Sequence, residues 1–86
     1  MANQSPPPEL IEVYHLLKTG QRNEAARRLK AYIPQHRGDA DAWWLLAHAV
    51  PQVEYQRHCL EEVLRLRPND GRARAWLDRL TPDAAP

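Results

Sequence analysis

From residue 9 to residue 80, apolar side chains recur with the 3.6-residue period of an amphipathic helix, and no stretch alternates as a half-buried strand would. Prolines and glycines divide this region into five helical blocks, which we predict at about 9–19, 23–33, 39–50, 51–67 and 70–80. The connections between the blocks are at most about five residues long, which makes neighbouring helices antiparallel. The sequence therefore predicts an all-α fold built as a chain of helical hairpins.

Several residues are placed to begin or end these helices. Asp39 and Asp70 precede the third and fifth blocks, and we predict them as N-caps because short carboxylates accept hydrogen bonds from the first free backbone N–H groups. The pair Thr19-Gly20 is a typical stop signal for the first helix. Pro51 suits the first turn of the fourth helix.

The predicted core combines large and small apolar side chains. Leu29 and Trp43 are large where helices interlock, whereas Ala25 and Ala47 are small where two helices cross closely. Cys59 falls on the apolar face of its helix, where a thiol is usually inert.

Length and composition restrict the class of protein. A chain of 86 residues buries only about 60% of its unfolded surface, which leaves little room for a catalytic cleft and favours a non-catalytic binding module. A single cysteine excludes an internal disulfide and a cysteine-based zinc site, and the four histidines lack metal-ligand spacing, so we expect no metal or cofactor. We expect one domain over 9–80, between a proline-rich arm (1–8) and a tail or linker start (81–86).

Neither a membrane segment nor a secretory leader is visible in the sequence. The longest uninterrupted apolar run, residues 42–47, is far shorter than the roughly 20 residues that a membrane helix needs. The first ten residues have neither a basic start nor an apolar stretch. We therefore expect a cytoplasmic protein.

Two segments of the chain repeat one pattern. In the first, a glycine turn at Gly20 precedes Ala25 and Leu29, and residues 43–47 follow as Trp-Trp-Leu-Leu-Ala. The second copy ends over residues 61–70 with Glu-Glu-Val-Leu-Arg-Leu-Arg-Pro-Asn-Asp. This arrangement resembles the tetratricopeptide repeat, a helical hairpin of about 34 residues. The resemblance covers nearly all of residues 9–80 and implies a right-handed stack of about two hairpins plus a final helix.

The second copy departs from the family pattern. It lacks the glycine turn, about three residues are missing around 49–51, and Gln56 stands where the family has a small alanine. We therefore expect this hairpin to cross at an altered angle. The first helix lacks the signature tryptophan, and we expect it to cap the stack.

The resemblance also implies a function. Members of this family bind a peptide or partner protein in a groove lined by the first helices of successive hairpins. Carried over to this chain, that groove is lined by Tyr14, Lys18, Asp41, Trp44, Leu45, His48, Arg72 and Arg79. Trp44 is the expected hot spot because it lies about 100° round its helix from Trp43. The alternative is that Trp44 packs beneath the first or fifth helix.

Other functions stay open. Short stacks expose apolar ends, so the chain could self-associate as a homodimer. It could also be the N-terminal adaptor module of a longer protein. A third candidate is binding of an acidic partner or nucleic acid through five arginines near the end, at positions 65, 67, 72, 74 and 79. Interleaved acidic residues and a net charge of +1 argue against nucleic acid as the partner, because they cancel most of the positive field.

Overall fold

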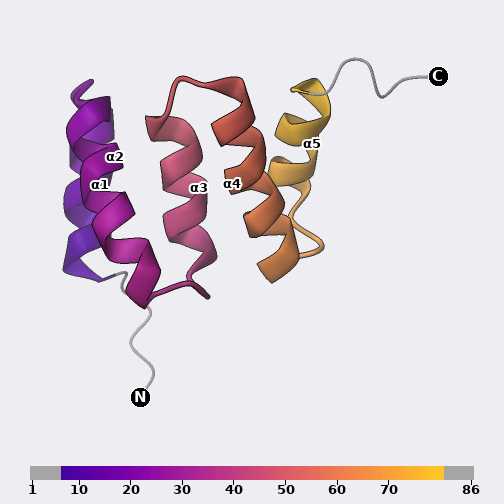
Figure 1. Ribbon diagram of the computed structural model, residues 1–86, viewed down its shortest axis with the longest axis horizontal. Coiled ribbons are helices and arrows are strands. Elements are labelled where there is room, and N and C mark those ends of the chain that lie inside the picture. Colours follow the sequence, from indigo (N-terminus) through magenta and orange to yellow (C-terminus); the bar gives the residue numbers. More distant parts are fainter. Residues whose placement is uncertain (1–6, 81–86) are drawn as a thin grey trace.

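A computed structural model of the chain describes residues 7–80 (Figure 1). These residues form α1 (Pro8–Lys18), α2 (Arg22–Tyr32), the 3-10 turn η1 (Ile33–Gln35), α3 (Ala40–Ala49), α4 (Val53–Leu66) and α5 (Gly71–Arg79), with no strand among them. Over this part of the chain, no helix is long and apolar enough to cross a membrane. The prediction of an all-α fold is confirmed.

The helix boundaries at the start of the domain differ slightly from the predicted ones. Helix α1 begins at Pro8, which we had assigned to the arm, because proline is well suited to the first turn of a helix. The rest of the predicted arm, apart from Pro7, and the predicted tail over 81–86 lie outside the described residues.

The helices follow one another across the molecule as antiparallel hairpins (Figure 1). Helix α3 lies at the centre, where it packs against α4 on one side and against α2 and α1 on the other, and α5 packs against α4. A stack of helical hairpins is therefore the observed architecture, and its right-handed turn stays a prediction.

The core extends along the whole stack. Leu29, Ala25, Ala47 and Cys59 have no exposed surface, as the sequence predicted, and Leu60 has none either. These side chains form one continuous cluster with apolar residues of every α-helix. Large side chains such as Leu29 and Leu60 and small ones such as Ala25 and Ala47 are both fully buried in this cluster, as close helix packing requires.

Trp43 is less buried than we predicted. It packs against the core cluster but is only half-buried, at the edge between α3 and α4. Its indole Nε1–H donates to the carbonyl oxygen of Arg37 at 3.2 Å. A tryptophan has a polar N–H that must reach a partner, and here that partner lies in an exposed loop.

The turn between α1 and α2 depends on Gly20, whose φ is +80°. Its N–H donates to the Leu17 carbonyl at 3.2 Å, and the Gln21 N–H donates to the Leu16 carbonyl at 2.8 Å. This pair of bonds is a Schellman motif, which satisfies carbonyl groups left free at the end of a helix. The predicted stop at Thr19-Gly20 is confirmed.

Asp39 caps α3 as predicted and also binds the preceding helix. Its Oδ1 accepts from the backbone N–H groups of Asp41 and Ala42 at 3.1 and 3.4 Å. Its Oδ2 accepts from the Tyr32 hydroxyl at 2.8 Å. Burial, together with this hydrogen bond, raises the pKa of Tyr32 to about 12. Asp70 caps α5 in the same way, by accepting from the N–H groups two and three residues on.

Pro51 does not lie in the first turn of the fourth helix, contrary to our prediction. Val50 is extended, with φ −97° and ψ 140°, because a residue before proline is disfavoured in the helical region. Gln52 is extended as well, so α4 begins only at Val53. The Gln56 side chain donates to the Val50 carbonyl at 2.8 Å, so it bridges the gap between α3 and α4.

We predict that Gly20→Ala lowers the free energy of unfolding by about 1–2 kcal/mol, because an L-residue resists positive φ. No atom lies within 4 Å of the added methyl group, so the effect comes from the backbone alone. Gly38→Ala is the matched control, since Gly38 has equal space and no positive φ. Urea unfolding should show the control unchanged or slightly stabilised. Equal losses of unfolding free energy in Gly20→Ala and Gly38→Ala would show that the positive φ of Gly20 is not the cause.

Candidate functional site

The structure brings six of the eight predicted groove residues to two adjoining hollows between α1 and α3. The first, of about 230 Å³, is lined by Leu10, Ile11, Tyr14, Asp41, Trp44 and Leu45. The second, of about 250 Å³, is lined by Tyr14, Leu17, Lys18, Arg22, Trp44, Leu45 and His48. Because they share Tyr14, Trp44 and Leu45, we treat the two as one site and call it the Trp44 hollow.

Helix geometry explains why these side chains meet. Ile11, Tyr14 and Lys18 follow a three- and four-residue spacing, which places them on one face of α1. Ile11 and Tyr14 are 43% and 52% exposed, although both carry large apolar groups. The Lys18 ammonium lies 5.3 Å from the centre of the Tyr14 ring. This face of α1 thus presents apolar surface with a cation at one end.

Trp44 belongs both to the hollow and to the packing against α5. Its ring meets Trp76 edge-on at 5.5 Å and His48 at 5.0 Å between ring centres. The Arg72 guanidinium lies 4.8 Å from the centre of the Trp44 ring, within cation–π range. Trp44 is half-buried, so its ring is supported from one side and remains partly accessible.

Of the two groove residues predicted on α5, Arg72 reaches the site and Arg79 does not. Arg72 is joined to the site through Trp44. Arg79 is the last residue of α5, and it neither lines the Trp44 hollow nor shares a contact with its lining among the described residues.

Sequence reasoning missed four residues of this region. Ile11 could have been found, because it lies one helical turn before Tyr14 on the same face. Trp76 is half-buried and in contact with both Trp44 and His48. Leu17 of α1 and Arg22, the first residue of α2, also line the second hollow.

The ionisation of His48 depends on this arrangement. Its ring lies 4.7 Å from that of Trp76 between centres. Partial burial lowers the pKa of His48 below its ordinary value of 6.5, and the positive charges of Arg22 and Arg72 lower it further. The lowered pKa favours the neutral imidazole, so His48 adds less positive charge to the hollow than an ordinary histidine would.

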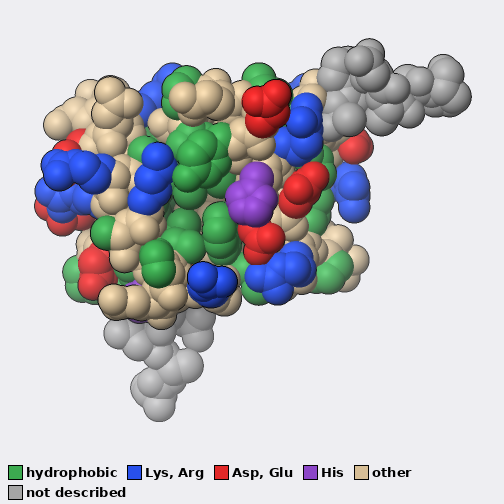
Figure 2. Space-filling view, viewed as in Figure 1, with side chains coloured by type: hydrophobic (Ala, Val, Ile, Leu, Met, Phe, Trp, Pro, Cys, Tyr) green, Lys and Arg blue, Asp and Glu red, His purple; other side chains and the backbone are tan. Residues whose placement is uncertain are grey.

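A larger hollow lies on the other side of α3. It measures about 560 Å³ and is lined by Lys30, Ile33, Pro34, Arg37, Trp43, Leu46, Tyr55, His58 and Glu62. We call it the Trp43 hollow. Figure 2 shows this face of the molecule, where hydrophobic side chains gather over the middle, between α2 and α4, and charged side chains surround them. No part of it was predicted as a site.

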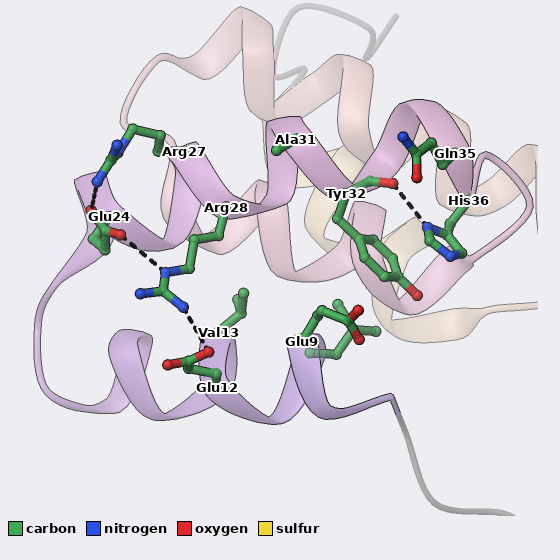
Figure 3. Close-up of a pocket in the computed structure, with 11 residues that line it drawn as sticks. Glu9, Glu12, Val13, Glu24, Arg27, Arg28, Ala31, Tyr32, Gln35 and His36 are labelled. Atoms are coloured by element: carbon green, nitrogen blue, oxygen red, sulfur yellow. Dashed lines mark hydrogen bonds and ion pairs between the residues drawn. The ribbon is translucent and has the colours of Figure 1, made fainter.

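A third hollow, of about 510 Å³, lies between α1 and α2 (Figure 3). Arg28 crosses it and pairs with Glu12 of α1 at 2.6 Å and with Glu24 of its own helix at 3.0 Å. Hydrogen bonds from Arg27 and Arg28 lower the pKa of Glu24. The charges at this end of the hollow are thus satisfied within the protein, and they hold α1 against α2.

The arginine-rich end of the chain is partly ion-paired, as the sequence suggested. Arg65 pairs with Glu62 at 2.8 Å. Arg67 pairs with Asp41 of α3 at 2.8 Å and approaches Asp70 at 3.9 Å. These exposed pairs contribute little to stability, but they reduce the positive field that a phosphate backbone would meet.

The described residues contain no group of three or more His, Cys, Asp or Glu side chains that could hold a metal ion. Cys59 is fully buried, and burial raises the pKa of its thiol to about 12. A thiol with this pKa is protonated at neutral pH, so it is a poor nucleophile.

In comparisons with known proteins, the chain matches no family model, no curated protein and no solved structure.

We predict that the His48 pKa, measured by NMR titration of its imidazole, lies below 6.5 and rises in Arg72→Gln, because one of the nearby positive charges is removed. Arg74→Gln, on the same helix, is the control and should leave it unchanged. Because folding lowers this pKa, the stabilising contribution of neutral His48 is complete above about pH 6.5 and is lost as the pH falls through the folded pKa. A His48 pKa that is equal in wild type and Arg72→Gln would contradict the electrostatic assignment.

Proposed function

We propose that this protein is a non-catalytic interaction module that binds a peptide segment of a partner protein in the Trp44 hollow. The observation that carries the proposal is the convergence of Tyr14, Trp44 and Leu45, from two helices, on one partly exposed surface. The resemblance to tetratricopeptide repeats supports the same assignment, since six of the eight residues it implied for a groove line this hollow. A cytoplasmic location belongs to the same proposal.

Aromatic side chains suit this role. Tryptophan and tyrosine are enriched at the energetic centres of protein interfaces, because they bury a large area for few rotatable bonds. The Trp44 ring is held by Trp76, His48 and Arg72, so a ligand would not have to immobilise it. A preformed surface binds a flexible peptide at a lower entropic cost than a mobile one.

The absence of catalysis is part of the proposal. One observation supports a non-catalytic role: Cys59 is buried in the core, where its thiol is protonated and is a poor nucleophile. The polar side chains around the Trp44 hollow are Lys18, Arg22, Asp41 and His48. Asp41 is engaged by Arg67, and the remaining cations are placed to steer and orient an anionic ligand.

We predict that Trp44→Ala weakens peptide binding about 30-fold, the loss typical of an interface hot spot of 2 kcal/mol. The ligand is obtained by selecting displayed random dodecapeptides on the immobilised chain and synthesising the enriched sequences. Fluorescence polarisation then gives the dissociation constant of each peptide for wild type and variants.

Two further variants separate binding from folding. Tyr14→Ala truncates a side chain that is 52% exposed, so it should weaken binding while changing the free energy of unfolding by less than about 0.5 kcal/mol. Val53→Ala truncates a side chain that is 47% exposed and lines neither hollow, and it should leave binding unchanged. The proposal fails if no peptide is enriched, or if the enriched peptides bind all three variants like wild type.

A further inference from the structure

The Trp43 hollow has the composition of a binding site, and the function proposed above does not use it. Its floor is apolar, since Ile33 and Leu46 are 6% and 2% exposed. Its walls are aromatic: Trp43 meets the His58 ring edge-on at 5.7 Å between centres, and Tyr55 is 36% exposed. A volume of about 560 Å³ is sufficient for one or two side chains of a ligand.

The polar groups of this hollow are mainly cationic. The Lys30 ammonium lies 5.1 Å from the centre of the Tyr55 ring, and neither Lys30 nor Arg37 has an ion pair within residues 7–80. The one acidic residue in the lining, Glu62, is already paired with Arg65 at 2.8 Å. Two unpaired cations therefore flank an apolar floor, and an anionic ligand complements them.

The Trp43 ring contributes apolar surface, because its polar atom is already in use. The indole N–H donates to the Arg37 carbonyl, so it is not free to donate to a ligand. That hydrogen bond also fixes the ring relative to the loop that carries Arg37. Specific polar contacts to a ligand would come from Lys30 and Arg37, which both line the hollow.

We propose that the Trp43 hollow is a second docking site, for an acidic peptide segment. An aromatic or aliphatic side chain of that segment inserts between Trp43 and Tyr55, and neighbouring carboxylates bind Lys30 and Arg37. The site lies across α3 from the Trp44 hollow, so one protein can hold two partners at once. This inference does not depend on peptide binding in the Trp44 hollow.

The test uses two matched pools of labelled peptides and the whole chain. Both pools are dodecapeptides with a randomised aromatic or aliphatic residue at the centre. In the first pool the flanking positions are Asp and Glu, and in the second they are Asn and Gln. Each pool is passed over immobilised wild type and two variants, Lys30→Gln combined with Arg37→Gln, and Trp44→Ala.

We expect wild type and Trp44→Ala to retain the acidic pool, and the double variant to retain about fivefold less, the effect of losing two exposed charge contacts. The amide pool should be retained less well by every protein. Arg74→Gln, which removes an exposed cation that lines neither hollow, is the matched control and should behave like wild type. Chemical-shift changes on adding the acidic pool should be larger at the Trp43 indole than at that of Trp44.

Three results would overturn the proposal. Equal retention of both pools would show that the cations do not select the ligand. No retention of the acidic pool by wild type would show that the hollow binds no such segment. Retention that is lost in Trp44→Ala but not in the double variant would place acidic peptides in the Trp44 hollow, which would leave the function proposed above intact.

Discussion

The close packing of α3 between its neighbours is the constraint on which the rest of the structure depends. Ala42, Ala47 and Ala49 are at most 1% exposed, and their small side chains allow α1, α2 and α4 to approach the α3 backbone. A helix buried on most sides cannot rotate without displacing all of its neighbours. Its two adjacent tryptophans differ by about 100° in direction, so the same packing sends one ring to each side of the stack.

The loop between α2 and α3 fixes the two hairpins relative to each other. Asp39 caps α3 with one carboxylate oxygen and binds the Tyr32 hydroxyl with the other. The His36 ring stacks on the Tyr32 ring at 3.9 Å between centres, 8° from parallel. Because the same loop supplies the carbonyl that holds Trp43, one short segment determines both the hairpin contact and the wall of a hollow.

The fold was predictable because its determinants are local. Asp39, Asp70 and Gly20 act at the helix ends where they stand in the sequence, and the helical period identified the buried leucines. The prediction that Pro51 begins the fourth helix was wrong. It considered only that proline suits a first helical turn, whereas proline also disfavours the helical conformation of Val50, the residue before it.

The candidate sites were less predictable because they depend on contacts between helices. The family resemblance implied that Tyr14 and Trp44 share one surface, and both line the same hollow. The resemblance could not show that Trp76 would turn toward Trp44, since that contact depends on how α5 packs. The Trp43 hollow was missed for the same reason, because its lining comes from three helices and the turn that follows α2.

Although the net charge is only +1, the unpaired charges are unevenly distributed over the molecule. Several acidic side chains are engaged inside the protein: Glu12 and Glu24 by Arg28, Glu62 by Arg65, and Asp41 by Arg67. Asp39 and Asp70 are directed at helix N-termini. The cations without an ion pair among the described residues include Lys18 and Arg22 at one hollow and Lys30 and Arg37 at the other. Both aromatic hollows are therefore bordered by positive charge, and a ligand responds to this local field rather than to the average over the chain.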